Sequence, residues 1–169
     1  NYPNQSIFSE YCSTGDNHIV VYHGQLIRER GIFDIINAVG LLTKSFPHIK
    51  LNLIGWFTNK SEKKQTKELI KKLNIDQNVS IINSVDHAQI PTLISQARVG
   101  VSPLHNIVKF QRNIPTKVFE YVACGLHVVS SNLAPTMNLK DSNKWCKFYE
   151  PGNVNELVTE IETILRDKV

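Results

Sequence analysis

The sequence contains little cysteine and no long apolar run. Its 169 residues include three cysteines, which lie far apart and form no Cys-x-x-Cys pair. This pattern disfavours both a disulfide framework and a cysteine-based zinc site. The apolar segments are interrupted well before the roughly 18 residues that a transmembrane helix requires. We therefore expect one globular domain from a reducing compartment such as the cytoplasm.

Acidic residues are absent from one long stretch of the chain. No Asp or Glu lies between Asp86 and Glu120, whereas the chain as a whole has 15 acidic and 19 basic residues. The stretch contains four basic residues, which account for the whole formal excess of +4: Arg98, Lys109, Arg112 and Lys117. This local excess indicates an anionic ligand. An ordinary solvated surface is an equally good interpretation of the charges alone.

Short β-branched segments alternate with segments of helical periodicity. The pattern predicts strands at 18–23, 49–54, 79–82, 99–101, 127–130 and 147–149. It predicts helices at 32–42, 61–73, 89–97, 115–123 and 154–165. Because the intervals are long enough for right-handed crossovers, we expect a doubly wound, Rossmann-like α/β fold. Its parallel sheet would have about six strands, with helices on both faces.

Ligands of such sheets bind beyond the carboxyl ends of the strands. One loop at this edge carries Gly24 and Gly31, but it lacks the G-x-G-x-x-G spacing of a dinucleotide-binding loop. Another leads through Pro115 into a predicted helix, in which Lys117 and Glu120 are three residues apart on one face. A carboxylate and a cation in one crevice suit the ribose and the phosphates of a nucleotide. The alternative is an ordinary ion pair at the surface.

Several motifs occur in a fixed order along the chain. They are Tyr22-x-Gly24, Arg30-Gly31, Leu53-Ile54-Gly55, Val99-Gly100-Val101-Ser102-Pro103-Leu104, Pro115-x-Lys117-x-x-Glu120-Tyr121-x-Ala123-x-Gly125 and Glu150-Pro151-Gly152-Asn153. Together they resemble the carboxy-terminal domain of group 1 (family 4) glycosyltransferases, which is one half of the GT-B fold. The resemblance extends from about residue 20 to residue 165, and its most specific part is 115–129.

The resemblance implies a role for individual residues. Glu120 would hold the ribose hydroxyls of a nucleotide-sugar, and Arg30 would contact its diphosphate, with Lys117 as a further cation. Gly24 would lie beside the phosphates. The remaining donor-binding positions are Gln25 and Arg112, the backbone N–H groups of Val118 and Phe119 at the distal phosphate, and the base loop of Asn83, Ser84 and Val85.

The sequence departs from the family pattern at three of these positions. Gln25 replaces an Arg that binds phosphate, Arg112 replaces the first of two paired glutamates, and Asn83 replaces a Gly. We interpret these differences as divergence. The alternatives are a non-catalytic nucleotide-sugar-binding module and a sugar-nucleotide epimerase of similar fold, which the 115–125 motif disfavours. Nucleic-acid binding has no motif to support it.

The function that the resemblance implies is retaining transfer of a sugar from a UDP- or GDP-sugar to a polysaccharide or glycolipid acceptor. The family generally needs no metal or other cofactor. Residues 1–17 are similar to the hinge that follows an amino-terminal acceptor domain, and 18–169 would form the donor domain. We expect the chain alone to bind the donor without transferring it. The intact enzyme would be a bacterial cytoplasmic protein, with peripheral association at the inner face of the membrane.

Overall fold

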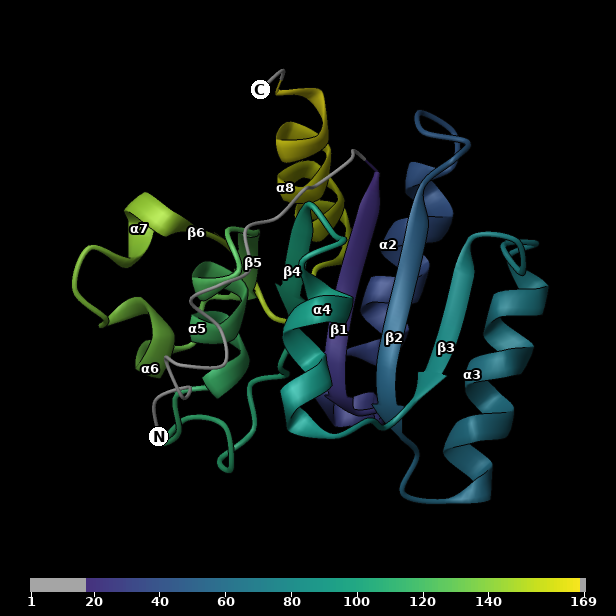
Figure 1. Cartoon of the computed structure of the whole chain (residues 1–169), viewed down its shortest axis with the longest axis horizontal. Helices are drawn as coiled ribbons and strands as arrows, with labels where there is room; N and C mark the ends of the chain where they lie inside the picture. The colour runs from purple at the N-terminus through teal and green to yellow at the C-terminus, as the bar shows by residue number, and fades with distance from the viewer. Residues whose placement is uncertain (1–17, 168–169) are drawn as a thin grey trace.

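The computed structural model describes residues 18–167 and contains a six-stranded, all-parallel sheet (Figure 1). The strands are β1 (Ile19–Gln25), β2 (Lys50–Trp56), β3 (Val79–Asn83), β4 (Val99–Ser102), β5 (His127–Ser131) and β6 (Cys146–Tyr149). Their order is β3-β2-β1-β4-β5-β6. This confirms the doubly wound, Rossmann-like fold, and every strand boundary lies within two residues of the prediction. The strand order reverses between β1 and β4, where such sheets form a ligand crevice.

The strands are connected by helices and short helical turns. These are η1 (Arg28–Arg30), α2 (Ile32–Leu42), α3 (Lys60–Lys72), η2 (His87–Gln89), α4 (Ile90–Ile94), α5 (Thr116–Ala123), α6 (Ala134–Met137), α7 (Ser142–Trp145) and α8 (Val154–Arg166). The helix predicted at 89–97 is a 3-10 turn followed by the five-residue α4. The four-residue helices α6 and α7 were not predicted, because a single turn has no apolar periodicity.

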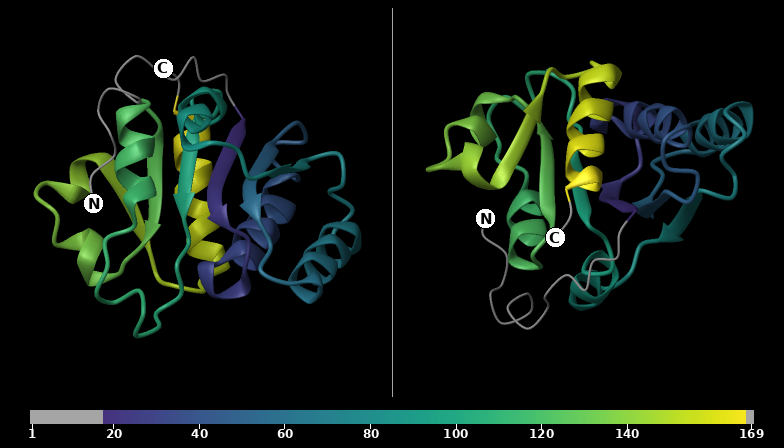
Figure 2. Two further views of the ribbon diagram at one scale, coloured as in Figure 1. Left: turned by 60° about the horizontal axis from the view of Figure 1, so that its bottom comes forward. Right: turned by 90° about the horizontal axis from the view of Figure 1, so that it is seen from above.

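Both faces of the sheet are covered by helices (Figure 2). One face packs against α2, α3 and α8 and includes Val20 and Val99 in its core. The other packs against α4 and α5 and includes Val21 and Val128. Successive residues of β1 thus point into opposite cores. This burial on both faces explains why β1 and β5 contain adjacent apolar residues, Val20-Val21 and Val128-Val129, by which they could be located in the sequence.

The 115–123 prediction is confirmed in detail. Pro115 is the N-cap of α5, and Gly125 follows the helix with a φ of 75°.

Cys124 and Cys146 are buried free thiols. Cys12 and the predicted hinge at 1–17 lie outside the described residues, as do 168 and 169. Within residues 18–167, no helix combines the length and the apolar character needed to cross a membrane.

Candidate donor-binding site

A cavity of about 280 Å³ lies at the carboxyl ends of the central strands, and we call it the central cavity. β1 and β2, the loop after β3 and the first turns of α5 all contribute to its wall. Its lining residues are His23, Gly24, Arg30, Ile54, Gly55, Trp56, Ser84, Val85, His87, Ile90, Thr116, Lys117 and Glu120. Six of the predicted site residues therefore meet in one place: Gly24, Arg30, Ser84, Val85, Lys117 and Glu120.

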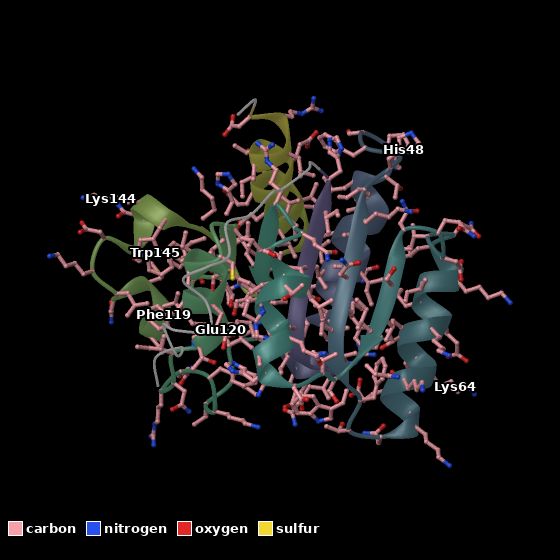
Figure 3. All side chains as sticks on the ribbon, viewed as in Figure 1. His48, Lys64, Phe119, Glu120, Lys144 and Trp145 are labelled. Carbon is pink, nitrogen blue, oxygen red and sulfur yellow. The ribbon has the colours of Figure 1, made fainter. Side chains whose placement is uncertain are left out.

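Glu120 is the acid of this cavity, and two histidines lie beside its carboxylate. Figure 3 shows Glu120 on the side of α5 that faces the central strands. Its residue is only 3% exposed. His87 Nε2 is hydrogen-bonded to Oε1 at 2.9 Å. His23 Nε2 approaches Oε2 to 2.8 Å but is not aligned for a hydrogen bond, so that oxygen has no aligned donor within the described part of the chain.

The ionisation of Glu120 depends on this pair of histidines. Burial acts to raise the pKa of the carboxyl, but the contacts with His23 and His87 outweigh it and lower the pKa below its ordinary value. Burial lowers the pKa of His23, and the positive charge of Lys117 lowers it further, against the opposite effect of Glu120. Glu120 is therefore an anion at neutral pH, and His23 is a neutral imidazole. An ionised carboxylate is the form that accepts hydrogen bonds from two ribose hydroxyls.

The position of His23 is fixed by the residue after Glu120. The backbone N–H of His23 donates to the Tyr121 hydroxyl at 3.2 Å, and the His23 and Tyr121 rings meet edge to face with centroids 5.3 Å apart. Tyr121 is fully buried between α5 and β4, where its hydroxyl donates to the Val101 carbonyl at 3.4 Å. Edge-to-face packing of this kind stabilises the ring orientation. Neighbouring residues of α5 thus supply the carboxylate and orient one of its histidines.

Lys117 is a buried lysine whose side-chain nitrogen has no hydrogen-bond acceptor in the described structure. The residue is 5% exposed, and its Nζ lies 3.7 Å from the centroid of the Tyr22 ring. A Cβ atom on Gly24 would lie 3.4 Å from this Nζ, so the ammonium reaches the turn after β1. Burial, together with the charge of Arg30, lowers the pKa of Lys117 well below its ordinary value. A bound anion would supply the missing acceptor.

Arg30 brings a second positive charge to the same wall. It is the last residue of η1, and its Nε also lacks a partner among the described residues. Its guanidinium lies 5.5 Å from the centroid of the Phe110 ring. Burial raises the pKa of Tyr22, and the charge of Arg30 only partly offsets this effect, so the phenol stays neutral. It cannot neutralise the two adjacent cations.

Two further cavities adjoin the central one. The first, which we call the Trp56 cavity, has a volume of about 400 Å³ and is lined by Gly55, Trp56, Phe57, Asn59, Lys60, Lys63, Asn83 and Ser84. The second, which we call the lysine cavity, has a volume of about 220 Å³. It is lined by Arg30, Leu104, Lys109, Phe110, Asn113, Ile114, Pro115, Thr116 and Lys117. Asn83 thus lines the Trp56 cavity and not the central one.

Four other predicted site residues have different surroundings. The Val118 N–H donates to the Pro115 carbonyl at 3.2 Å, so it is engaged by the helix's own first turn. The Val118 side chain is in the core, and Phe119 projects from α5 on the side away from Glu120 (Figure 3). Arg112 is exposed, and neither it nor Gln25 lines any of the three cavities.

The sequence of residues 4–168 matches the family described as glycosyl transferases group 1. The chain belongs to the group 1 glycosyltransferases. A search of curated protein sequences found no match.

The fold is similar to those of solved glycosyltransferase structures. Anabaena HepE in complex with UDP is 19% identical with a TM-score of 0.79, over 90% of this chain and 40% of that one. Sucrose-phosphate synthase from Thermosynechococcus elongatus is 23% identical with a TM-score of 0.76, over 98% and 40%. The C-terminal domain of the group 1 protein LpcC from Francisella tularensis is 17% identical with a TM-score of 0.75, over 98% and 85%. The chain thus spans about 40% of the HepE chain.

Sequence reasoning did not identify two side chains that line the central cavity and contact Glu120, His23 and His87. A signal for His23 was present, because it is a polar residue at the carboxyl end of a buried strand, directly before Gly24. His87 gave no such signal, since it lies in the loop after β3 and meets α5 only in the folded chain. Among the described residues, no group of three or more His, Cys, Asp and Glu side chains is placed to hold a metal ion.

Proposed function

We propose that the chain is the donor-binding domain of a retaining glycosyltransferase, which transfers a sugar from a UDP- or GDP-sugar to a polysaccharide or glycolipid. One observation carries the proposal: the central cavity combines the buried, ionised Glu120 with the unpartnered ammonium of Lys117. These two groups match the ribose and the diphosphate of one ligand. The HepE structures with UDP and with UDP-glucose support this choice of ligand.

The proposed chemistry follows from the position of the cations. As the bond between the sugar and the distal phosphate breaks, negative charge accumulates on the departing nucleoside diphosphate. Lys117 and Arg30 already lie at the cavity wall and stabilise that charge with little reorganisation. Because two side chains supply positive charge at the leaving group, the proposed mechanism requires no metal ion. Glu120 anchors the ribose and keeps the phosphates beside the cations.

The acceptor and the remaining catalytic groups are assigned to another domain. In this proposal, 18–169 form the donor domain and 1–17 lead from an acceptor-binding domain. Closure of the two domains completes the active site, so the present chain alone binds the donor but does not transfer sugar. TarM, solved with UDP and glycan ligands, and the lipopolysaccharide galactosyltransferase WaaB have similar folds, which supports a glycan or glycolipid acceptor. Such an acceptor would bring the intact enzyme to the inner face of the membrane.

Calorimetric titration with UDP, GDP and ADP tests the proposal. We expect one of these nucleotides to bind, and a Glu120→Gln variant to weaken that binding by about 1.5–3 kcal/mol, since it removes charged hydrogen bonds to the ribose. The matched control is Glu68→Gln, which makes the same change at an exposed position of α3. If no nucleotide binds, or if both variants bind as the wild type does, the proposed site is wrong.

A non-catalytic nucleotide-sugar-binding module is a second candidate. It is favoured by the lining of the lysine cavity, which contains no carboxylate from residues 18–167, and by the replacement of the expected glutamate by Arg112, which lines none of the three cavities. Transfer of labelled sugar by a longer protein that also contains an acceptor domain distinguishes the two candidates. A protein that binds the donor and transfers nothing would establish the module.

A further inference from the structure

The lysine cavity lies directly beyond the proposed diphosphate position. It shares three lining residues with the central cavity, Arg30, Thr116 and Lys117, so these form the border between the two spaces. Glu120 lines only the central cavity. A nucleotide-sugar is linear, with the ribose, two phosphates and the sugar in that order. With the ribose at Glu120 and the phosphates at the border cations, the sugar enters the lysine cavity.

The lining of this cavity is strongly cationic. Arg30, Lys109 and Lys117 all contribute to it, and no acidic side chain of the described residues does. The guanidinium of Arg30 and the ammonium of Lys109 lie 5.5 and 5.8 Å from the centroid of the buried Phe110 ring. Two of the three cations, Arg30 and Lys109, thus lie beside the Phe110 ring, and Lys117 lies over the Tyr22 ring.

The charges of the diphosphate account for only part of this cluster. Arg30 and Lys117 face both cavities and can match its two negative charges, whereas Lys109 lines the lysine cavity alone. Within residues 18–167, no carboxylate lies within ion-pair distance of Lys109. The carboxylate of Asp34 is paired with His105, at 2.7 Å, and not with Lys109. Lys109 is exposed to solvent at the edge of the cavity, and an anion on the sugar side of the phosphates would give its ammonium a charged partner.

We propose that the donor sugar is acidic, a hexuronic acid whose carboxylate is bound by Lys109 in the lysine cavity. This inference depends on the proposed function, because it uses the ribose and diphosphate positions assigned above. A neutral hexose would leave the ammonium of Lys109 facing hydroxyl groups. A hexuronate gives it a charged acceptor, and charged hydrogen bonds are roughly twice as strong as neutral ones. The side chain of Asn113, which also lines the cavity, can donate to the sugar hydroxyls.

Sugar phosphates without a nucleoside test this proposal independently of the base. We would titrate the chain with glucuronic acid 1-phosphate and with glucose 1-phosphate, which differ only in a carboxylate against a hydroxymethyl group. We expect the acidic compound to bind at least tenfold more tightly. In a Lys109→Met variant the preference should fall below twofold. Lys109 is exposed, so we expect the variant to fold, and its melting temperature verifies this.

A second lysine serves as the matched control. Lys60→Met makes the same change of charge at the edge of the Trp56 cavity, on the other side of the central cavity. If it reduces the preference as much as Lys109→Met does, the preference reflects the overall positive charge and the proposal is overturned. Equal binding of the two sugar phosphates, or no binding of either, also overturns it. The nucleotide titration is separate: a nucleotide bound through Glu120 without this preference leaves the proposed function intact.

Discussion

Replacing Lys117 by Met is predicted to stabilise the fold and to impair ligand binding. Removing a buried donor without a partner should contribute about 1–3 kcal/mol to stability. The lost contact with the Tyr22 ring offsets about 0.5–2 kcal/mol of this. We therefore expect a net gain of about 1 kcal/mol. For a domain of this size that corresponds to a rise of roughly 2–4 °C in melting temperature.

The pH dependence of this gain follows from the pKa of Lys117. Because the pKa is lowered in the folded chain, the unfolded chain binds more protons between the folded value and the ordinary value of 10.5. The stability of the wild type therefore rises with pH in that interval. Lys117→Met has no such group, so its advantage should shrink as the pH approaches 10.5. Urea unfolding of both proteins at pH 7 and pH 9.5 measures this change.

The same variant should lose affinity for a nucleoside diphosphate. Loss of a charged hydrogen bond of about 1.5–3 kcal/mol weakens binding roughly 10- to 150-fold, which calorimetry with UDP or GDP detects. The control is Lys67→Met at an exposed position of α3, which should change neither property by more than about 0.5 kcal/mol. A Lys117→Met protein that is less stable than the wild type, or that binds nucleotide normally, would refute the reasoning.

Two further predictions concern stability. The pKa of Glu120 is lowered in the folded chain, so the ionised carboxylate contributes stability above its ordinary pKa of 4.5. This contribution is lost as the pH falls through the folded pKa. The unfolding curves of the wild type and of Glu120→Gln should therefore converge at acid pH. Gly31 has a φ of 74°, and a Cβ there would lie 1.8 Å from the Pro103 carbonyl oxygen, so Gly31→Ala should cost about 3 kcal/mol or more. Gly152 has a φ of 81°, and nothing lies within 4 Å of a Cβ atom placed there. Gly152→Ala should therefore cost only about 1–2 kcal/mol. Urea unfolding measures both costs, and equal costs for the two variants would contradict the steric explanation.

The sheet could be predicted from the sequence because its central strands are buried on both faces. Segments such as 49–54 and 127–130 contain adjacent apolar residues, Leu53-Ile54 and Val128-Val129, and such pairs distinguish them in the sequence. The irregular segment between β5 and β6 could not be predicted in the same way. Its helices α6 and α7 have four residues each, and Asp141, the N-cap of α7, has a φ of 55°. Tertiary packing and not local periodicity determines such turns.

The site could be predicted only as far as local spacing specifies it. The spacing of Lys117 and Glu120 placed both on one face of α5, and both line the central cavity. The alternative interpretation, a surface ion pair between them, is wrong, because the two residues are only 5% and 3% exposed and each has other neighbours. Their partners come from other elements: Tyr22 and His23 from β1, and His87 from η2. Which side chains converge there depends on the strand order and on rotamers.

The opposite surroundings of Glu120 and Lys117 explain how one short helix can bind a dianionic ligand. Glu120 is partly satisfied before any ligand arrives, since His87 is hydrogen-bonded to one carboxylate oxygen and His23 lies 2.8 Å from the other without an aligned hydrogen bond. Lys117 is not satisfied, because burial removes its ammonium from water without supplying an acceptor. A ligand whose phosphates reach Lys117 therefore removes a penalty as well as adding a contact. Ligand binding should accordingly stabilise the wild-type chain by more than it stabilises Lys117→Met. If saturating nucleotide raised both melting temperatures equally, Lys117 would not be the phosphate-binding group.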